Sequence, residues 1–217
     1  MTRPIKIDFV SDVSCPWCIV GLKSLEQALA NASDAVSATI HFQPFELNPQ
    51  MAPEGEDIGE HIAKKYGSTP EQRKQSQEML RQRGESVGFR FEMGARDRIW
   101  NTFDAHRLLY WADEEGRQRE LKHALFDAYF TKGESPASHE VLLRVATQVG
   151  LDPARAADIL ASNEFAGEVR EKEEFYRRAG ISSVPAIIIN ERHLISGGQT
   201  PEVFEKALRD IAAEVPV

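Results

Sequence analysis

The spacing of hydrophobic residues changes several times along the chain. Residues 5–10 alternate and are rich in Ile, Phe and Val, which is typical of a β-strand. From Pro16 onward apolar residues recur every three or four positions, which predicts a helix with proline at its first position. Residues 38–45 indicate a second strand. Because a helix joins the two strands, we expect them to be parallel, with a right-handed crossover.

Helical spacing then dominates from residue 57 to about residue 179. Thr69 with Gln72, Asp152 before Pro153, and the pair 163–164 have the pattern of helix starts. Glycines predict an irregular stretch over residues 84–98. One helical stripe is expected to contain Ile99, Phe103, His106, Leu109 and Tyr110.

The β pattern returns near the C-terminal end. Residues 185–189 and 193–196 predict a hairpin around a turn at 190–192. Thr200 and Pro201 then precede a closing helix whose inner face is expected to carry Val203, Phe204, Leu208 and Ile211. The order βαβ…ββα predicts an α/β fold. We expect one discontinuous sheet domain, residues 1–48 and 176–217, with an all-helical domain inserted at 49–175; closure entropy rises slowly enough to tolerate the long connection.

Composition narrows the class of protein. The chain has 217 residues, of which 41% are hydrophobic, so it can bury a substantial core. Its net charge of -8 argues against nucleic acid or an anionic membrane surface as a partner. Lys6 and Asp8 interrupt the first apolar run, which does not resemble a signal peptide, and no run approaches the roughly 20 apolar residues of a membrane span. We expect a cytoplasmic location and leave the oligomeric state open.

The two cysteines of the chain form the motif Cys15-Pro16-Trp17-Cys18. The motif follows a strand and opens a helix, where unpaired N–H groups and the helix dipole stabilise negative charge. The thiolate is the reactive form of cysteine. We expect Cys15, at the helix start, to be the more exposed nucleophile, and Cys18, one turn further, to be the resolving thiol.

Three other interpretations of the motif compete with a redox centre. A structural disulfide would close too small a loop to constrain the unfolded chain. A zinc site needs two more ligands, and no two histidines have ligand spacing, so no metal is expected. Two inert buried thiols are the third alternative.

Several segments together resemble the DsbA-like branch of the thioredoxin superfamily, and within it the FrnE-like subgroup. They are residues 11–18 with Gly21, residues 101–107, and Val184-Pro185 followed by Gly197. The resemblance implies a thioredoxin-like fold and a thiol–disulfide oxidoreductase whose partner is a disulfide- or thiol-containing protein or small molecule. It implies no required cofactor beyond the cysteine pair, with glutathione or another thiol as a co-substrate.

The resemblance also assigns roles to single residues. Taken alone, Pro185 is a strand-starting trans proline; the resemblance implies a cis proline against the cysteines, with the Val184 backbone presented to substrate. Pro16 and Trp17 are expected to support the active site, although Trp17 fits simple packing equally well. A lone histidine on an apolar face, such as His106, is usually a core residue. The resemblance of residues 101–107 makes Asn101 and His106 candidates for lining the substrate cleft.

The same branch contains a different class of enzyme. The 2-hydroxychromene-2-carboxylate isomerases and kappa-class glutathione transferases are glutathione-dependent and typically carry serine where Cys15 stands. Having both Cys15 and Cys18 favours redox chemistry over this alternative, and also over a non-catalytic binding module, which need not keep either thiol. The direction of electron flow is left open, because it depends on the reduction potential.

Overall fold

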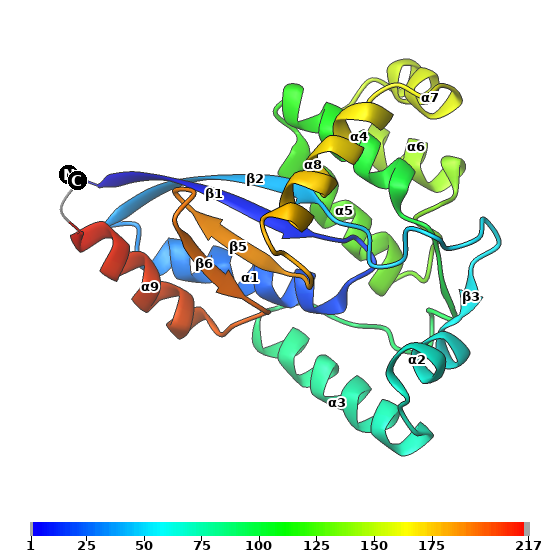
Figure 1. Ribbon diagram of the computed structural model, residues 1–217, viewed down its shortest axis with the longest axis horizontal. Coiled ribbons are helices and arrows are strands. Elements are labelled where there is room, and N and C mark those ends of the chain that lie inside the picture. Colours follow the sequence, from blue (N-terminus) through cyan, green and yellow to red (C-terminus); the bar gives the residue numbers. More distant parts are fainter. Residues whose placement is uncertain (1, 215–217) are drawn as a thin grey trace.

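The computed structural model describes residues 2–214, and its centre is a four-stranded sheet (Figure 1). The strand order is β2-β1-β5-β6. The strands are β1 (Arg3–Ser11), β2 (Val36–Pro44), β5 (Ala186–Ile189) and β6 (His193–Ser196).

The sheet confirms the predicted βαβ and ββ units. β1 and β2 run parallel over their full length, from the Arg3–Val36 pair to the Ser11–Pro44 pair, and α1 (Pro16–Asn31) connects them. β5 pairs antiparallel with both β1 and β6, which forms the expected hairpin. The second strand begins and ends earlier than the predicted residues 38–45.

Helices make up most of the connection between β2 and β5. They are α2 (Ile58–Tyr66), α3 (Pro70–Ser86), α4 (Phe103–Glu114), α5 (Gln118–Phe130), α6 (His139–Gln148), α7 (Pro153–Ala161) and α8 (Ala166–Arg178), with α9 (Pro201–Ala213) closing the chain. Two short strands, β3 (Glu56–Asp57) and β4 (Arg98–Ile99), pair with each other within this connection.

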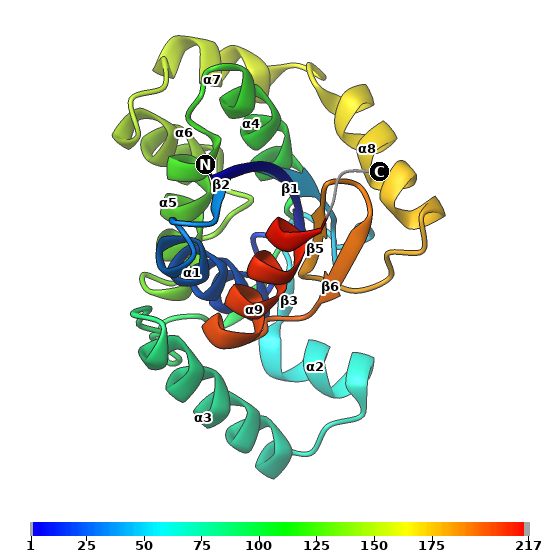
Figure 2. The same ribbon diagram turned by 90° about the vertical axis from the view of Figure 1, so that its left-hand side faces the viewer.

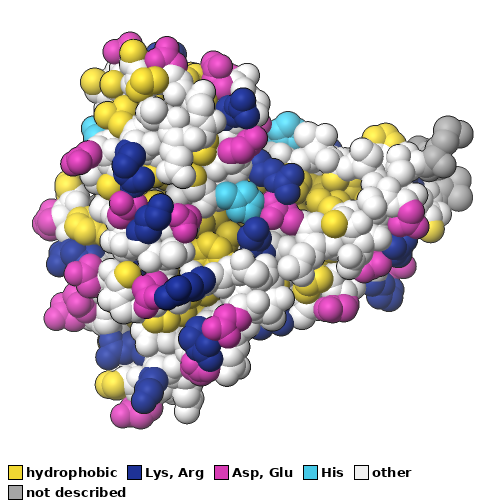
Figure 3. All heavy atoms as spheres, turned by 180° about the vertical axis from the view of Figure 1, so that it is seen from behind, with side chains coloured by type: hydrophobic (Ala, Val, Ile, Leu, Met, Phe, Trp, Pro, Cys, Tyr) yellow, Lys and Arg dark blue, Asp and Glu magenta, His cyan; other side chains and the backbone are white. Residues whose placement is uncertain are grey.

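Helices cover both faces of the sheet. α1 and α9 pack side by side on one face, and α8 lies on the other (Figures 1 and 2). Beside the sheet, α4 to α7 enclose a core of their own, and α2 and α3 extend from the side on which α1 lies. On the face seen in Figure 3, acidic and basic side chains are interspersed over the helical block.

The inserted helices and the sheet share part of one core. Phe91, Phe126 and Phe130 belong to the same buried cluster as Phe9 and Cys18. The expected boundary between residues 175 and 176 falls inside α8. The division of the chain into two domains therefore stays a prediction.

Four local predictions were wrong. α3 continues through Gly84, Ile99 lies in β4 rather than in a helix, and Phe165 rather than residues 163–164 occupies the N-cap of α8. Val203 is exposed, while Phe204, Leu208 and Ile211 are buried as expected. Gly84 belongs in the helix because its missing Cβ makes room for Phe91: an ideal Cβ would lie 2.5 Å from the Phe91 ring.

Within residues 2–214, none of the helices combines the length and the apolar character needed to cross a membrane.

Candidate active site

Cys15 occupies the N-cap of α1, and Pro16 takes the first helical position, as predicted. The Cys15 backbone is extended, with φ -88° and ψ 114°, and its N–H donates to the Asp12 carbonyl at 3.2 Å. The N–H of Cys18 donates to the Cys15 carbonyl at 3.1 Å. This single turn places one sulfur at the positive end of the helix dipole and the other one turn inside it.

Both thiols are free and both are buried. Cys15 is 3% exposed and Cys18 is 0% exposed, so Cys15 is the more exposed of the two, as expected, although it too is buried. The environments differ more than the exposures do. Burial, and then the neighbouring Cys15, raise the pKa of Cys18 well above its usual value, while the charge of Lys122 opposes the shift. Cys18 is therefore held as a protonated thiol at neutral pH.

Val184 and Pro185, which come late in the sequence, lie beside Cys15 in the structure. The peptide bond between them is cis, as the resemblance implied. The thiol of Cys15 donates to the Val184 carbonyl, with 3.6 Å between Sγ and O. Val184 is half-buried, so part of its backbone segment borders the surface beside the reactive sulfur.

The two glycines after β6 close the other side of this site. The N–H of Gly197 donates to the Pro185 carbonyl at 2.8 Å, and Gly197 has a φ of 81°. An ideal Cβ on Gly198 would lie 2.9 Å from the Trp17 carbonyl oxygen. Glycine is required at this approach, because a side chain would push the loop away from the motif. Trp17 itself is half-buried and packs against the main core.

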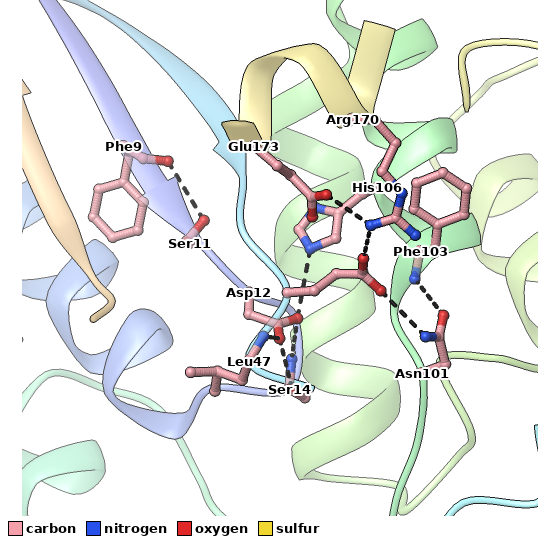
Figure 4. A network of polar contacts seen from close by, with 11 residues as sticks. Phe9, Ser11, Asp12, Ser14, Leu47, Asn101, Phe103, His106, Arg170 and Glu173 are labelled. Carbon is pink, nitrogen blue, oxygen red and sulfur yellow. Dashed lines mark hydrogen bonds and ion pairs between the residues drawn. The ribbon is translucent and has the colours of Figure 1, made fainter. Parts of the chain in front are cut away.

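Asp12, three residues before Cys15, joins several parts of the site (Figure 4). Its carboxylate accepts hydrogen bonds from the Ser14 N–H at 3.2 Å, the Ser14 hydroxyl at 3.0 Å and the Leu47 N–H at 2.7 Å. Burial raises the pKa of Asp12, but the adjacent His106 and these N–H donors outweigh it, so the pKa is lowered overall. Asp12 therefore remains ionised and fixes the loop that enters the motif.

His106 and Asn101 lie behind this loop rather than at the surface next to the thiols. Buried His106 places its Nε2 3.5 Å from an Asp12 oxygen, and this nitrogen has no hydrogen-bond partner among residues 2–214. Half-buried Asn101 donates to Glu46 at 3.2 Å and accepts from the N–H of Phe103 at 2.9 Å. Their assignment as cleft-lining residues stays a prediction; the contacts seen are with Asp12, Glu46 and the start of α4.

Sequence reasoning missed the rest of this polar network. Arg170 on α8 pairs with the buried carboxylates of Glu46 and Glu173 (Figure 4). Burial and the charge of Glu173 raise the pKa of Glu46. Arg170 and Glu173 are one turn apart on α8, but Glu46 lies 124 positions before Arg170, and the sequence pattern contains no signal that brings it to them.

Lys122 was also missed, although it is fully buried on α5. Its Nζ lies 5.1 Å from the Phe126 ring centre and 5.9 Å from that of Phe42. The sequence held one usable sign: Lys122 is four residues before Phe126, so the two side chains lie on the same face of a helix.

Among residues 2–214 no cluster of three His, Cys, Asp or Glu side chains has a geometry that could hold a metal ion.

The fold and this dithiol define the class of protein as a thioredoxin-fold enzyme acting on disulfides. A family model for the DSBA-like thioredoxin domain matches residues 6–209, and the chain belongs to that family. The FrnE-like subgroup stays a prediction.

Three similar proteins cover nearly the whole chain. A probable DsbA oxidoreductase from Streptomyces coelicolor is 31% identical, with a TM-score of 0.91 over 98% of this chain and 92% of its own. The uncharacterized protein YwbO of Bacillus subtilis is 26% identical over 97% of this chain and 98% of its own length. The cytosolic disulfide reductase DsbM from Pseudomonas aeruginosa shares the fold, at 16% identity and a TM-score of 0.65, over 95% of this chain and 98% of its own.

Proposed function

We propose that the protein is a dithiol–disulfide oxidoreductase that cycles Cys15 and Cys18 between dithiol and disulfide. The observation that carries this proposal is the placement of Cys15. Its sulfur is at the N-cap of α1 and 3.6 Å from the Val184 carbonyl, with Cys18 one turn away. A helix start favours the thiolate, and the half-buried segment at Val184 offers backbone groups to an extended substrate.

The reaction consists of two exchange steps. The Cys15 thiolate attacks one sulfur of a substrate disulfide, a new S–S bond forms, and the other substrate sulfur leaves as a thiolate that takes up a proton. Cys18 then loses its proton and attacks the Cys15 sulfur, which releases the second substrate thiol. Two electrons have passed to the substrate and the protein holds a Cys15–Cys18 disulfide. The reverse sequence oxidises a dithiol.

We infer that a small thiol restores the reduced protein without a bound cofactor. The structure of the cytosolic reductase DsbM was determined with GSH, which supports glutathione as a candidate reductant here. Substrates would be proteins or small molecules that contain a disulfide or thiol. A cytoplasmic location fits this reductant, because glutathione keeps thiols reduced in the cytosol.

The roles of the two cysteines are tested by separate variants. Cys15→Ser should abolish dithiothreitol-driven reduction of insulin, measured as the onset of turbidity. Cys18→Ser should instead accumulate a mixed disulfide on Cys15, visible by mass spectrometry under non-reducing conditions. Full reductase activity in Cys15→Ser would refute the proposed function.

The glutathione-dependent isomerase class makes an opposite prediction. Isomerisation of a chromene carboxylate in the presence of glutathione, with no change in protein thiol count, would assign the chain to that class. For a redox enzyme, equilibration with mixtures of reduced and oxidised glutathione should give one reduction potential for the Cys15–Cys18 pair. Its value against the glutathione poise sets the direction of exchange.

A further inference from the structure

Lys122 is a charged residue whose side chain is fully buried. Its side chain is 0% exposed, and its Nζ stands over the rings of Phe126 and Phe42. Within residues 2–214 it forms no ion pair at 4.0 Å or less with a carboxylate. Removing an ammonium from water costs several kcal/mol unless another charge compensates, and the face of an aromatic ring returns only about 2 kcal/mol. An ammonium group buried at this position therefore needs a stabilising interaction beyond the two aromatic rings.

The negative charges that Lys122 faces belong to the active site. Burial lowers the pKa of Lys122 to about 8, and the charges of Cys18, Asp12 and Cys15 oppose that shift. The influence is mutual, since the Lys122 charge lowers the pKa of Cys18. The geometry places Lys122 beside the cysteines, because the two rings under its Nζ, Phe42 and Phe126, belong to the same buried cluster as Cys15 and Cys18. α5 also packs against α1, which carries the cysteines, and against β2.

The other charged groups around this site are already engaged. Asp12, at the end of β1, is held by Ser14, Leu47 and the nearby His106 of α4. The carboxylates of Glu46 and Glu173 pair with Arg170. Tyr129 of α5 donates its hydroxyl to the Arg98 carbonyl at 2.9 Å. Among the described residues, Lys122 is thus the buried cation whose charge acts on the Cys18 sulfur.

We propose that Lys122 is a positioning residue that stabilises the negative charge on Cys18 as this sulfur displaces substrate from Cys15. This inference rests on the proposed function. The Cys18 thiol first loses its proton to solvent or to a substrate thiolate. Its sulfur then forms a bond to the Cys15 sulfur. The bond between Cys15 and the substrate breaks at the same time, and the substrate leaves as a thiolate. In the mixed disulfide Cys15 carries no charge, so of the two sulfurs only Cys18 is stabilised by the charge of Lys122.

The two sulfurs can be followed separately with dithiobis(nitrobenzoate) as the disulfide substrate. Attack by Cys15 releases one coloured nitrothiobenzoate, and displacement by Cys18 releases a second, in two phases of a stopped-flow trace. The variants are Lys122→Met and Lys122→Gln, which remove the charge but keep a similar length. The control is Lys172→Met. Lys122 and Lys172 both border a small cavity between β2 and α4, but Lys172 is half-buried and donates to Gln43.

We expect the second phase to slow about tenfold in both Lys122 variants, and its pH profile to move up by about one unit, the shift that corresponds to a tenfold change. The first phase should change much less, and Lys172→Met should leave both phases near the wild-type rates. Because replacing a buried charge by an apolar side chain is often neutral or stabilising, Lys122→Met should fold, as circular dichroism and a denaturant midpoint would show.

Two results separate failure of this inference from failure of the proposed function. A folded Lys122→Met protein whose second phase keeps the wild-type rate and pH profile would overturn the role of Lys122 alone. A wild-type protein that releases fewer than two nitrothiobenzoates per chain would overturn the dithiol reaction, and the role of Lys122 with it.

Discussion

The sulfur of Cys15 lies 3.6 Å from the carbonyl oxygen of Val184, a residue 169 positions later in the chain. This contact depends on how closely α1 approaches the segment that precedes β5. Gly21 makes the approach possible: an ideal Cβ at this position would lie 3.1 Å from Cγ of Pro185 and 3.2 Å from Cα of Gly198. The absence of a side chain at Gly21 thus allows the Cys15 sulfur and the Val184 carbonyl to lie this close together.

Gly21→Ala should therefore weaken both stability and exchange. The added methyl group forces Pro185 or the backbone at Gly198 to move by a few tenths of an ångström, and overpacking of this kind typically costs about 1–3 kcal/mol. We expect a lower denaturant midpoint and slower insulin reduction. Gly167→Ala is the matched control, because Gly167 is an exposed residue of α8 with no atom within 4 Å of an added Cβ. Equal behaviour of the two variants would show that the close approach at Gly21 is unimportant.

Gly84→Ala should destabilise the protein without acting on the redox centre directly. An ideal Cβ at Gly84 would lie 2.5 Å from the Phe91 ring and 2.7 Å from the Phe89 carbonyl. Phe91 is part of the main core, so we expect a loss of about 1–3 kcal/mol in the free energy of unfolding. Urea denaturation measures this loss. Gly94→Ala, where an added Cβ meets nothing within 4 Å, should stay close to wild type.

Gly84 also shows where sequence reasoning reaches its limit. A glycine in a helical pattern predicts a break, because the pattern reflects only the local helix propensity of each residue. The helix continues because the ring of Phe91, which folds back onto it from the loop that follows, needs the space. By contrast, the parallel β1–β2 pair and the start of α1 at Pro16 follow from local periodicity and capping, and both were predicted.

The residues of the candidate site also differ in whether the sequence could predict them. Cys15 and Cys18 are adjacent in sequence, so their motif could be found directly, and Val184-Pro185 could be placed through family resemblance. Lys122 could not be found by either route. Its burial and its position facing the cysteines result from the packing of α5 against α1, which is a tertiary relationship.

Asp12→Asn should reduce stability in a pH-dependent way. The pKa of Asp12 is lowered in the folded protein. A carboxyl with a lowered folded pKa adds stability that is fully present above its unfolded pKa of about 3.9. This stability is lost as the pH falls through the folded pKa. We expect Asp12→Asn to cost about 2 kcal/mol at pH 7, the scale of hydrogen bonds to a buried charge, and less at the lowest pH where the protein folds.

Urea denaturation of wild type and Asp12→Asn across this range measures the effect. Asp34→Asn provides a control, because Asp34 is an exposed carboxylate paired with Arg209 and should have little influence on unfolding. A difference between wild type and Asp12→Asn that stays constant down to the acid limit would mean that the carboxylate charge of Asp12 does not stabilise the fold.

Tyr66 is expected to contact polypeptide substrates. It ends α2 and is 65% exposed. Burial of part of the ring, and then the negative charge of Cys15, raise the pKa of Tyr66. The neighbouring Lys65 holds this end of α2 in place, because its Nζ donates to the Leu47 carbonyl at 2.8 Å. Leu47 in turn donates its N–H to Asp12.

Tyr66→Ala should therefore distinguish large substrates from small ones. A disulfide-containing polypeptide that packs on the ring loses contact area, and a loss of about 1 kcal/mol corresponds to roughly fivefold in rate. Dithiobis(nitrobenzoate) is too small to depend on this contact, so its two phases should be unchanged. Phe175→Ala removes another exposed aromatic ring, from α8, and should change neither reaction. α8 lies on the opposite face of the sheet from α1 (Figure 1). Equal slowing of both substrates in Tyr66→Ala would mean that the ring supports the active site rather than binding the polypeptide.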